Sequence, residues 1–369
     1  MSLQPISNFM RNRWKMAKNN DNDKAITIYD IAREAGVSPS TVSRVLTNSV
    51  NVRPEKRERV QALIEKYNFR PNALAKGLSD TRSRVIGVLM ADIRNPFYAA
   101  LYVSCENAAL ARGYRVILCC SLGETEREIE QLDILKQQSV EAIIQIGGMV
   151  DAVITDPAYI RKAKQISEQL PIITSGKIDE VSCHRVVIDS NEAVKLLAEH
   201  LISLGHERIA LVGGRLDVIS TYEKYMTFCK ILKAHGIPVN KRYVYEGTYD
   251  YDAGYEGVKE LMAMREKPTA IIAINDFCAA GVIRRLVEEG YRVPGDVSVV
   301  SYDNTYITNL IFPKITSIDY DYDTLGRMLA DTAIDVANGE SVPSFRSVTP
   351  RLEVRESSGR LCASARIGE

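Results

Sequence analysis

The stretch TIYDIAREAGVSPSTVSRVLT, residues 27–47, decides the fold of the amino-terminal part of this chain. In its first half, Ile28, Ile31, Ala32 and Ala35 recur at the spacing that places apolar side chains on one face of a helix. The second half repeats such a pattern over a shorter length. Residues 27–47 therefore predict two short helices that pack against each other.

The predicted helices carry their own start and stop signals. Thr27, followed three residues later by Asp30, has the form of a capping box. Gly36 is suited to the left-handed conformation that ends a helix. Ser38 can cap the second helix, and Pro39 suits its first turn. Together these residues predict a helix–turn–helix.

The second helix exposes a polar face. Val42, Val45 and Leu46 are expected to point inward. The residues left outside are Pro39, Ser40, Thr41, Ser43, Arg44 and Thr47. Short hydroxyl side chains can approach a major groove closely, and one arginine can pair with guanine. An ordinary solvated helix pair in a small bundle shows the same pattern, so these residues alone leave both interpretations open.

Charge is distributed unevenly along the 369 residues. Residues 1–84 contain 16 Lys and Arg against 8 Asp and Glu, whereas the whole chain is neutral. A basic module attached to an acidic body is typical of nucleic-acid binding, although a solvated basic surface is the alternative. We interpret 1–25 as a disordered basic arm, 26–70 as the headpiece and 71–84 as a hinge helix and linker.

From residue 85 onward, apolar β-branched runs alternate with amphipathic segments. The runs lie at 85–90, 114–120, 141–146, 170–175, 185–189, 207–213, 243–247, 269–275 and 297–303, with a closing strand near 348–354. Helices are expected near 97–112, 124–138, 157–168, 190–204, 221–235, 252–265, 277–289 and 324–338. This alternation predicts two doubly wound parallel sheets. The two sheets form a two-lobed α/β core over 85–358, followed by a tail at 359–369.

Polar residues follow most of the predicted strands. Ligands of open α/β sheets bind beyond the carboxyl ends of the strands, so two facing lobes predict a cleft lined by these residues. Asn, Asp and Gly also favour turns, which is the alternative for each residue taken singly. The positions are Asp92, Arg94, Asn95, Gln145, Gly176, Lys177, Asp189, Gly213, Gly214, Asn275, Asp276, Asp303 and Asn304.

Several classes of protein are disfavoured by what the sequence lacks. It contains no G-x-G-x-x-G, P-loop or G-x-S-x-G motif, and its four histidines show no metal-ligand spacing. We therefore expect no enzyme, no metal and no cofactor. Seven cysteines without a C-x-x-C pair indicate reduced thiols and a cytoplasmic protein. No signal peptide or membrane-spanning run is visible, which argues against a solute-binding protein of a transporter.

The headpiece and hinge resemble those of the lac-repressor (LacI/GalR) family of bacterial transcription regulators. The resemblance rests on TIYDIAREAGVSPSTVSRVL and RPNALAKGL, and continues through DIRNPFYAAL, LISLGHERIALVGG, AINDFCAAGVI, VPGDVSVVSYDNT and PRLEVRESSG. It implies a periplasmic-binding-protein-like core, with lobe 1 at about 85–184 plus 319–342 and lobe 2 at about 187–317 plus 344–357. It also implies a homodimer that binds a double-stranded DNA operator, most often as a repressor.

The resemblance further implies which residues contact DNA. Pro39, Ser40 and Arg44 match positions that read bases. Supporting contacts match Thr27, Tyr29, Ser38, Thr41, Ser43 and Asn51. Asn72, Ala75 and Leu78 match the hinge, where the leucine wedges into the minor groove. An apolar wedge of this kind unstacks a base step and kinks the duplex.

The effector cleft matches the family less closely. The expected effector-binding residues are Asn95, Phe97, Tyr98, Gln145, Lys177, Asp189, Lys224, Tyr249, Asn275, Asp303 and Tyr320. Many relatives have Asp-Arg where this chain has Gly176-Lys177, and Arg where it has Lys224. Two lysines in place of arginines suggest an anionic effector, such as a sugar phosphate or sugar acid, beside the family's usual sugars. The alternative is a drifted pocket, as in catabolite-control regulators that answer mainly to a phosphorylated partner protein.

Overall fold

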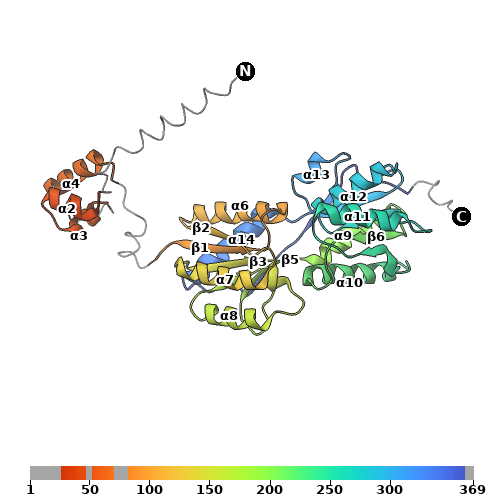
Figure 1. Ribbon diagram of the computed structural model, residues 1–369, viewed down its shortest axis with the longest axis horizontal. Helices are drawn as coiled ribbons and strands as arrows, with labels where there is room; N and C mark the ends of the chain where they lie inside the picture. The colour runs from red at the N-terminus through yellow and green to blue at the C-terminus, as the bar shows by residue number, and fades with distance from the viewer. Residues whose placement is uncertain (1–25, 47–51, 70–81, 362–369) are drawn as a thin grey trace, which may run out of the picture. The chain divides into compact units, whose positions relative to one another are not determined.

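The computed structural model describes residues 26–46, 52–69 and 82–361. The chain divides into two compact units, Met1–Arg82 and Ser83–Glu369 (Figure 1). Each unit has its own hydrophobic core, and each is described here by itself.

The described residues of the first unit form three helices, α2 (Ile28–Ala35), α3 (Pro39–Leu46) and α4 (Pro54–Lys66). The capping box of α2 is present, because the Asp30 amide donates to Thr27 Oγ1 at 3.3 Å and the Thr27 amide donates to Asp30 Oδ2 at 3.0 Å. Gly36 ends the helix with a φ of 64°. The predicted helix–turn–helix is therefore confirmed, including its turn.

The three helices close around a small apolar core. Ile31, Val42 and Val60, one from each helix, are fully buried. At the surface, Glu34 on α2 accepts hydrogen bonds from Lys66 Nζ at 2.8 Å and Tyr67 Oη at 2.7 Å. These contacts hold the end of α4 against α2 and stabilise the helical core on which α3 packs.

The second unit contains two six-stranded sheets. The first has the order β11-β5-β4-β3-β1-β2 and is parallel throughout. The second has the order β12-β10-β9-β8-β6-β7, with only β12 antiparallel. The strands are β1 (Val85–Met90), β2 (Arg115–Cys120), β3 (Ala142–Ile146), β4 (Ile172–Thr174), β5 (His184–Ile188), β6 (Ile209–Val212), β7 (Val244–Tyr245), β8 (Ala270–Ala273), β9 (Ser298–Asp303), β10 (Thr316–Asp319), β11 (Phe345–Val348) and β12 (Arg351–Glu353).

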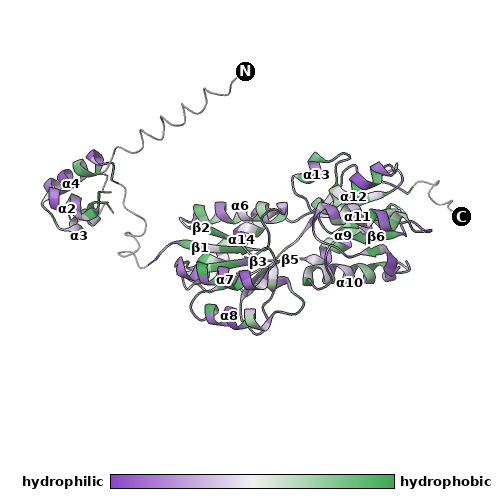
Figure 2. Cartoon of the chain, in the orientation of Figure 1, coloured by the Kyte–Doolittle hydropathy of each residue, from purple (hydrophilic) through white to green (hydrophobic). Residues whose placement is uncertain are grey.

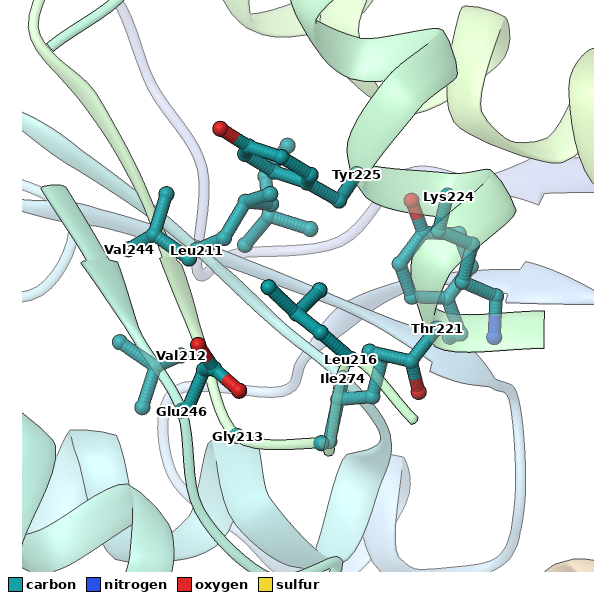
Figure 3. Close-up of a pocket in the computed structure, with 13 residues that line it drawn as sticks. Leu211, Val212, Gly213, Leu216, Thr221, Lys224, Tyr225, Val244, Glu246 and Ile274 are labelled. Carbon is teal, nitrogen blue, oxygen red and sulfur yellow. The ribbon is translucent and has the colours of Figure 1, made fainter. Parts of the chain in front are cut away.

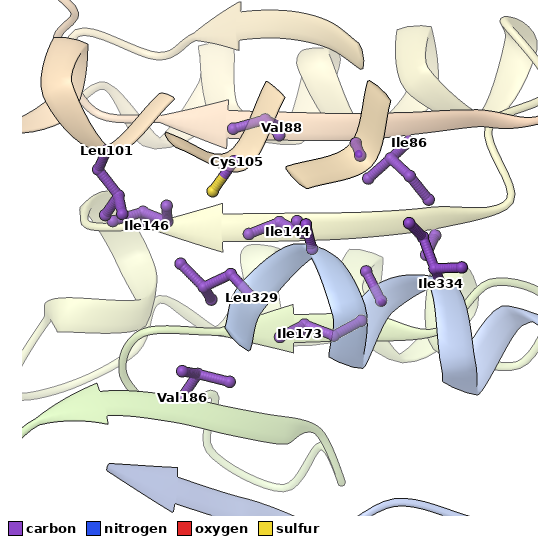
Figure 4. Packing of buried hydrophobic residues seen from close by; sticks show 14 of the residues in the cluster. Ile86, Val88, Leu101, Cys105, Ile144, Ile146, Ile173, Val186, Leu329 and Ile334 are labelled. Carbon is purple, nitrogen blue, oxygen red and sulfur yellow. The ribbon is translucent and has the colours of Figure 1, made fainter. Parts of the chain in front are cut away.

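Helices cover both faces of each sheet. They are α6 (Pro96–Ala111), α7 (Thr125–Gln137), α8 (Pro157–Ser167), α9 (Ser190–Ser203), α10 (Ile219–Ala234), α11 (Tyr251–Met262), α12 (Asp276–Glu288), α13 (Ile307–Leu310) and α14 (Tyr322–Ala337), with 3₁₀ turns η1 (Gly148–Asp151) and η2 (Lys241–Tyr243). In lobe 1, Leu329 of α14 and Cys105 of α6 pack with Val88 and Ile144 of the sheet (Figure 4). Hydropathy follows the same layering, because the strands are apolar and the outer helix faces are polar (Figure 2).

The boundary between the lobes differs from the prediction. We expected 344–357 in lobe 2, but β11 pairs with β5 from Phe345↔Arg185 to Val348↔Ile188, and so belongs to the first sheet. The predicted closing strand at 348–354 is two strands, β11 in lobe 1 and β12 in lobe 2, and Pro350 lies between them. An apolar run predicts a strand but not which sheet receives it.

Candidate nucleic-acid interface and ligand cleft

The candidate DNA-reading face lies on α3. Ser40 and Arg44 are exposed, whereas Val42 and Val45 on the opposite side are buried in the headpiece core. Ser38 precedes the helix and caps it, because the Thr41 amide donates to its Oγ at 3.3 Å. The same face therefore carries hydroxyl groups and one guanidinium within two turns of helix.

The structure describes some of the other residues that are expected to contact DNA, and the rest lie outside the described residues. Thr27, Ser38 and Tyr29 are exposed near the starts of α2 and α3, with 66% of Tyr29 accessible, and Pro39, Thr41 and Ser43 are half-buried on α3. Asn51, Asn72, Ala75 and Leu78 lie outside the described residues.

The candidate ligand site is a cleft between the lobes of the second unit, with a volume of about 1300 Å³. Loops at the carboxyl ends of strands from both sheets line it, as the fold class predicts. Ten of the eleven expected effector residues lie on its wall. They are Asn95, Phe97, Tyr98, Lys177, Asp189, Lys224, Tyr249, Asn275, Asp303 and Tyr320.

Gln145 is the exception, and its expected place in the cleft is wrong. It is the fourth residue of β3 and is buried behind the cleft wall. Its amide donates to Glu128, and its carbonyl accepts from the Tyr159 hydroxyl. Residue 145 lies inside both the predicted strand 141–146 and the observed β3, so it precedes the strand's end and packs within the lobe. Burial raises the pKa of Glu128 to about 7.

Lobe 2 presents a half-buried lysine, Lys224, and a buried aspartate, Asp303, to the cleft. Lys224 of α10 lies with its Nζ 4.5 Å from the centre of the Tyr302 ring. Burial lowers the pKa of Lys224, against the opposing effect of the Asp303 and Asp151 carboxylates. Burial raises the pKa of Asp303 to about 8, with Asp276 adding to the effect. The two groups oppose these shifts in each other, but burial is the larger cause for both.

A second, much smaller cavity of about 20 Å³ lies behind this wall (Figure 3). Lys224 and Tyr225 of α10 line it together with Leu211 and Val212 of β6. Its volume suits a single water molecule, so it is not an effector site by itself.

Asn275 has a structural contact as well as a place on the wall. Its Oδ1 accepts the Cys278 amide at 2.7 Å, which caps α12, and its Nδ2 donates to the Tyr249 carbonyl at 2.9 Å. The residue is almost fully buried. The expected polar group at this strand end is thus present, but much of its hydrogen-bonding capacity is used by the fold.

Phe97 lies between the two lobes. Its ring packs against the apolar cores of both lobes. It stands edge-on to Tyr320, with ring centres 6.1 Å apart, and 5.9 Å from Tyr322. The Tyr322 hydroxyl donates to the Asp303 carbonyl at 2.8 Å, which adds a polar contact between the lobes. Aromatic packing thus joins the two lobes at this edge of the cleft.

Sequence reasoning missed the residues that join the lobes at another edge. Asp151 of lobe 1 accepts hydrogen bonds from Ser220 of lobe 2. These residues are 69 positions apart, and neither follows a predicted strand directly. No pattern in the sequence could have paired them.

The helix–turn–helix unit and the two-lobed unit with an interlobe cleft together define a ligand-controlled DNA-binding regulator. Comparison with known families agrees: residues 27–72 match "Bacterial regulatory proteins, lacI family", and residues 198–358 match "Periplasmic binding protein-like domain". The chain belongs to the lacI family of bacterial regulatory proteins, and its function is that of a transcriptional regulator.

Individual relatives span almost the whole chain. Catabolite control protein A of Priestia megaterium is 34% identical over 90% of this chain and 99% of its own length. The lac repressor dimer bound to operator and the anti-inducer ONPF superposes with a TM-score of 0.81, at 26% identity over 91% of this chain and all of that one. An Enterococcus faecium regulator of this family with bound ribose gives a TM-score of 0.67, at 28% identity over 75% of this chain and all of that one.

Two further features are absent from the described residues. No helix among them is long and apolar enough to cross a membrane. No group of three or more His, Cys, Asp or Glu side chains in the same residues is arranged to hold a metal ion.

Proposed function

We propose that this protein acts in the cytoplasm as a homodimeric repressor, not an enzyme, and that a small molecule in the interlobe cleft changes its affinity for a pseudo-palindromic operator. The observation that carries the proposal is the presence, in one chain, of an exposed polar reading face on α3 and a deep cleft with walls from two lobes. Ligand and DNA then bias one conformational equilibrium, and each changes the affinity for the other by the same factor.

In this proposal Arg44 pairs with a guanine, and Ser40 and Pro39 contact neighbouring base edges. Thr27, Tyr29, Ser38, Thr41, Ser43 and Asn51 position the headpiece on the backbone, and Asn72, Ala75 and Leu78 act in the hinge. A gel-shift titration against fragments of upstream DNA tests this role. Specific binding is expected to weaken steeply as salt rises, because phosphate contacts release counterions. Equal retention of every fragment would contradict it.

Exposed apolar side chains on the second unit support the dimer. Phe312 is 90% accessible and Leu310 is 73% accessible beside α13. Leu110 on α6 is 65% accessible, and α6 and α13 run along the same side of the two lobes (Figure 1). Side chains of this size exposed along one side are typical of a protein–protein interface. We therefore place the second copy against this side.

The charges of the cleft support a neutral polyhydroxylated effector over the anionic one suggested by the two lysines. Seven carboxylates and five cationic side chains line the cleft. Three of the cations already pair with carboxylates two residues away: Lys177 with Asp179, Arg94 with Asp92, and Arg215 with Asp217. Arg185 donates to the Gly176 carbonyl at 2.7 Å. At four of the five cations, an anion would therefore have to displace existing partners.

The remaining wall suits a sugar. Aromatic rings of Phe97, Tyr98, Tyr249, Phe277, Tyr320 and Phe345 line the cleft. Such rings pack against the apolar faces of a sugar, while carboxyl groups such as that of Asp303 exchange hydrogen bonds with its hydroxyl groups. The ribose found in the Enterococcus faecium relative is a ligand of this kind.

Thermal-shift measurements on matched pairs test the ligand class. Ribose and ribose 5-phosphate, and glucose and glucose 6-phosphate, differ within each pair by one phosphate. We expect stabilisation by neutral members only. Stabilisation by the phosphates alone would contradict this part of the proposal while leaving DNA binding untouched.

The second candidate is a catabolite-control-type regulator that answers mainly to a phosphorylated partner protein. The 34% identity to catabolite control protein A favours it. Operator binding that no small molecule changes, but that a phosphorylated protein partner strengthens, would select this candidate.

A further inference from the structure

Two consecutive residues at the end of β9 adopt a backbone conformation that side chains rarely take. Asp303 has a φ of 99° and Asn304 a φ of 48°. Glycine adopts such angles readily, whereas other residues are held there only when the surrounding structure fixes them. Asp303 is the last residue of β9 and lies on the cleft wall. We call Asp303 and Asn304 the strained pair.

The buried side chain of Asp276, the first residue of α12, fixes the chain next to the strained pair. Its Oδ2 accepts the Thr305 amide at 2.6 Å and Thr305 Oγ1 at 2.9 Å. Its Oδ1 accepts the hydroxyl groups of Ser301 and Ser317, the latter at 2.8 Å. One carboxylate thus connects α12, the neighbouring strands β9 and β10, and the residue that follows the strained pair.

The strained pair is also held directly, through Asn304. The Asn304 amide donates to Ser317 Oγ at 3.0 Å, and Arg355 Nη2 donates to Asn304 Oδ1 at 2.7 Å. The amides of residues 304 and 305 therefore both donate to side chains, Ser317 and Asp276, and not to a neighbouring strand. These two side chains satisfy the buried backbone in the conformation that the strained pair adopts.

The carboxyl group of Asp303 differs from that of Asp276 in its partners. Burial raises the pKa of Asp276 to about 6, and the hydrogen bonds that it accepts oppose this shift. Within the described residues, by contrast, the Asp303 carboxyl group has no hydrogen bond, although it lies on the cleft wall. Its hydrogen-bonding capacity is available to a ligand, and its position depends on the backbone of the strained pair.

We infer that Asp276 and Ser317 are positioning residues of the ligand site: they hold the strained pair in its left-handed conformation, which places the Asp303 carboxyl group against a hydroxyl group of the ligand. Supporting hydrogen bonds of this kind keep a binding group within a fraction of an ångström of its working position. The inference deepens the proposed function and rests on its ligand class, a neutral sugar.

Two buried serines offer a matched pair of variants. Ser317→Ala removes a donor to Asp276 and also the acceptor of the Asn304 amide. Ser301→Ala removes a hydroxyl group that contacts Asp276 and Ser317 but not the strained pair. Titration calorimetry of the full-length protein with ribose and with glucose compares them. Ser317→Ala is expected to bind the sugar about three- to tenfold more weakly than Ser301→Ala, because only it releases the strained pair.

A glycine at position 304 gives a second reading that separates positioning from general loss of stability. Glycine adopts the left-handed conformation without support. Asn304→Gly added to Ser317→Ala is therefore expected to restore part of the lost sugar affinity, although it supplies no new hydrogen bond. Absence of this rescue would overturn the inference.

Amide exchange of the full-length protein without DNA or sugar tests the support directly. The Asn304 and Thr305 amides should be protected in the wild type. In Asp276→Ala the Thr305 amide should exchange at least about tenfold faster, and Asp276→Asn, which keeps an acceptor, should be milder. Ser298→Ala is the control, because Ser298 is a buried serine at the opposite end of β9. It should leave both amides unchanged.

Equal sugar affinities of folded Ser317→Ala and Ser301→Ala would overturn the inference, and so would unprotected Asn304 and Thr305 amides in the wild type. If neither sugar binds the wild type, the proposed ligand class fails instead. Exchange of the Asn304 amide in Ser317→Ala then still decides whether this side chain holds the strained pair.

Discussion

Arg44 projects from the exposed face of α3, where its guanidinium can form two parallel hydrogen bonds to one guanine. Arg44→Ala is expected to cost about 1–3 kcal/mol on the operator and to relax preference at one base position. Binding to operators permuted at each position measures this. Arg33→Ala is the control, because Arg33 is exposed on α2 and lies 3.6 Å from Asp30. If affinity for operator and random DNA fell equally, the assigned role of Arg44 would be wrong.

Glu128 is buried, and among the described residues it forms no ion pair; burial raises its pKa to about 7, above the ordinary value of 4.5. A carboxyl whose pKa is higher in the folded chain than in the unfolded chain destabilises the fold as it ionises. Ionisation of Glu128 therefore lowers the free energy of unfolding by roughly 3 kcal/mol as the pH rises from about 4.5 to about 7. We expect Glu128→Gln to be more stable than wild type at pH 8 and to lose that advantage by pH 5. Urea unfolding at both pH values measures it, and a gain independent of pH would contradict the account.

At the scale of elements, Asn275 follows a strand and stabilises the fold by capping the next helix, α12. Asn275→Ala removes the cap of α12 and is expected to lower the free energy of unfolding by about 1–2 kcal/mol. Asn275→Asp keeps an acceptor for the Cys278 amide and should be milder. Denaturant unfolding of both variants separates this role from ligand contact. Equal losses would show that the bond to the Tyr249 carbonyl, not the cap, matters.

Much of the fold could be predicted because the patterns that indicate a helix or a strand lie within a short stretch of sequence. The capping residues of α2 and the apolar runs of β1 and β3 are sequence patterns in their own right. The partner of a strand is not local, so β11 was placed in the wrong lobe. The predicted strand ends identified most of the residues that line the cleft. The buried hydrogen bonds around Gln145 and the pairing of Asp151 with Ser220 have no local sequence pattern, so they could not be predicted.

At the scale of the whole molecule, the exposed side chains of Leu310 and Phe312 are expected to be buried in the dimer interface. Leu310→Asp together with Phe312→Asp should shift the protein to monomers, because a desolvated charge opposes association. Light scattering after size-exclusion chromatography gives the mass directly. Val354→Asp, which also replaces an exposed apolar side chain, is the control. A folded double variant that stayed dimeric would move the interface elsewhere.

An occupied cleft is expected to change how tightly the headpiece binds one DNA sequence. Fluorescence anisotropy of the full-length protein on its selected operator and on a scrambled duplex, with and without a neutral sugar that raises its melting temperature, tests this most directly. We predict binding to the operator about a thousandfold or more tighter than to the scrambled duplex. The sugar should change operator affinity by roughly 5- to 150-fold and leave the scrambled duplex unaffected. Equal affinity for both duplexes, with and without the sugar, would contradict the account.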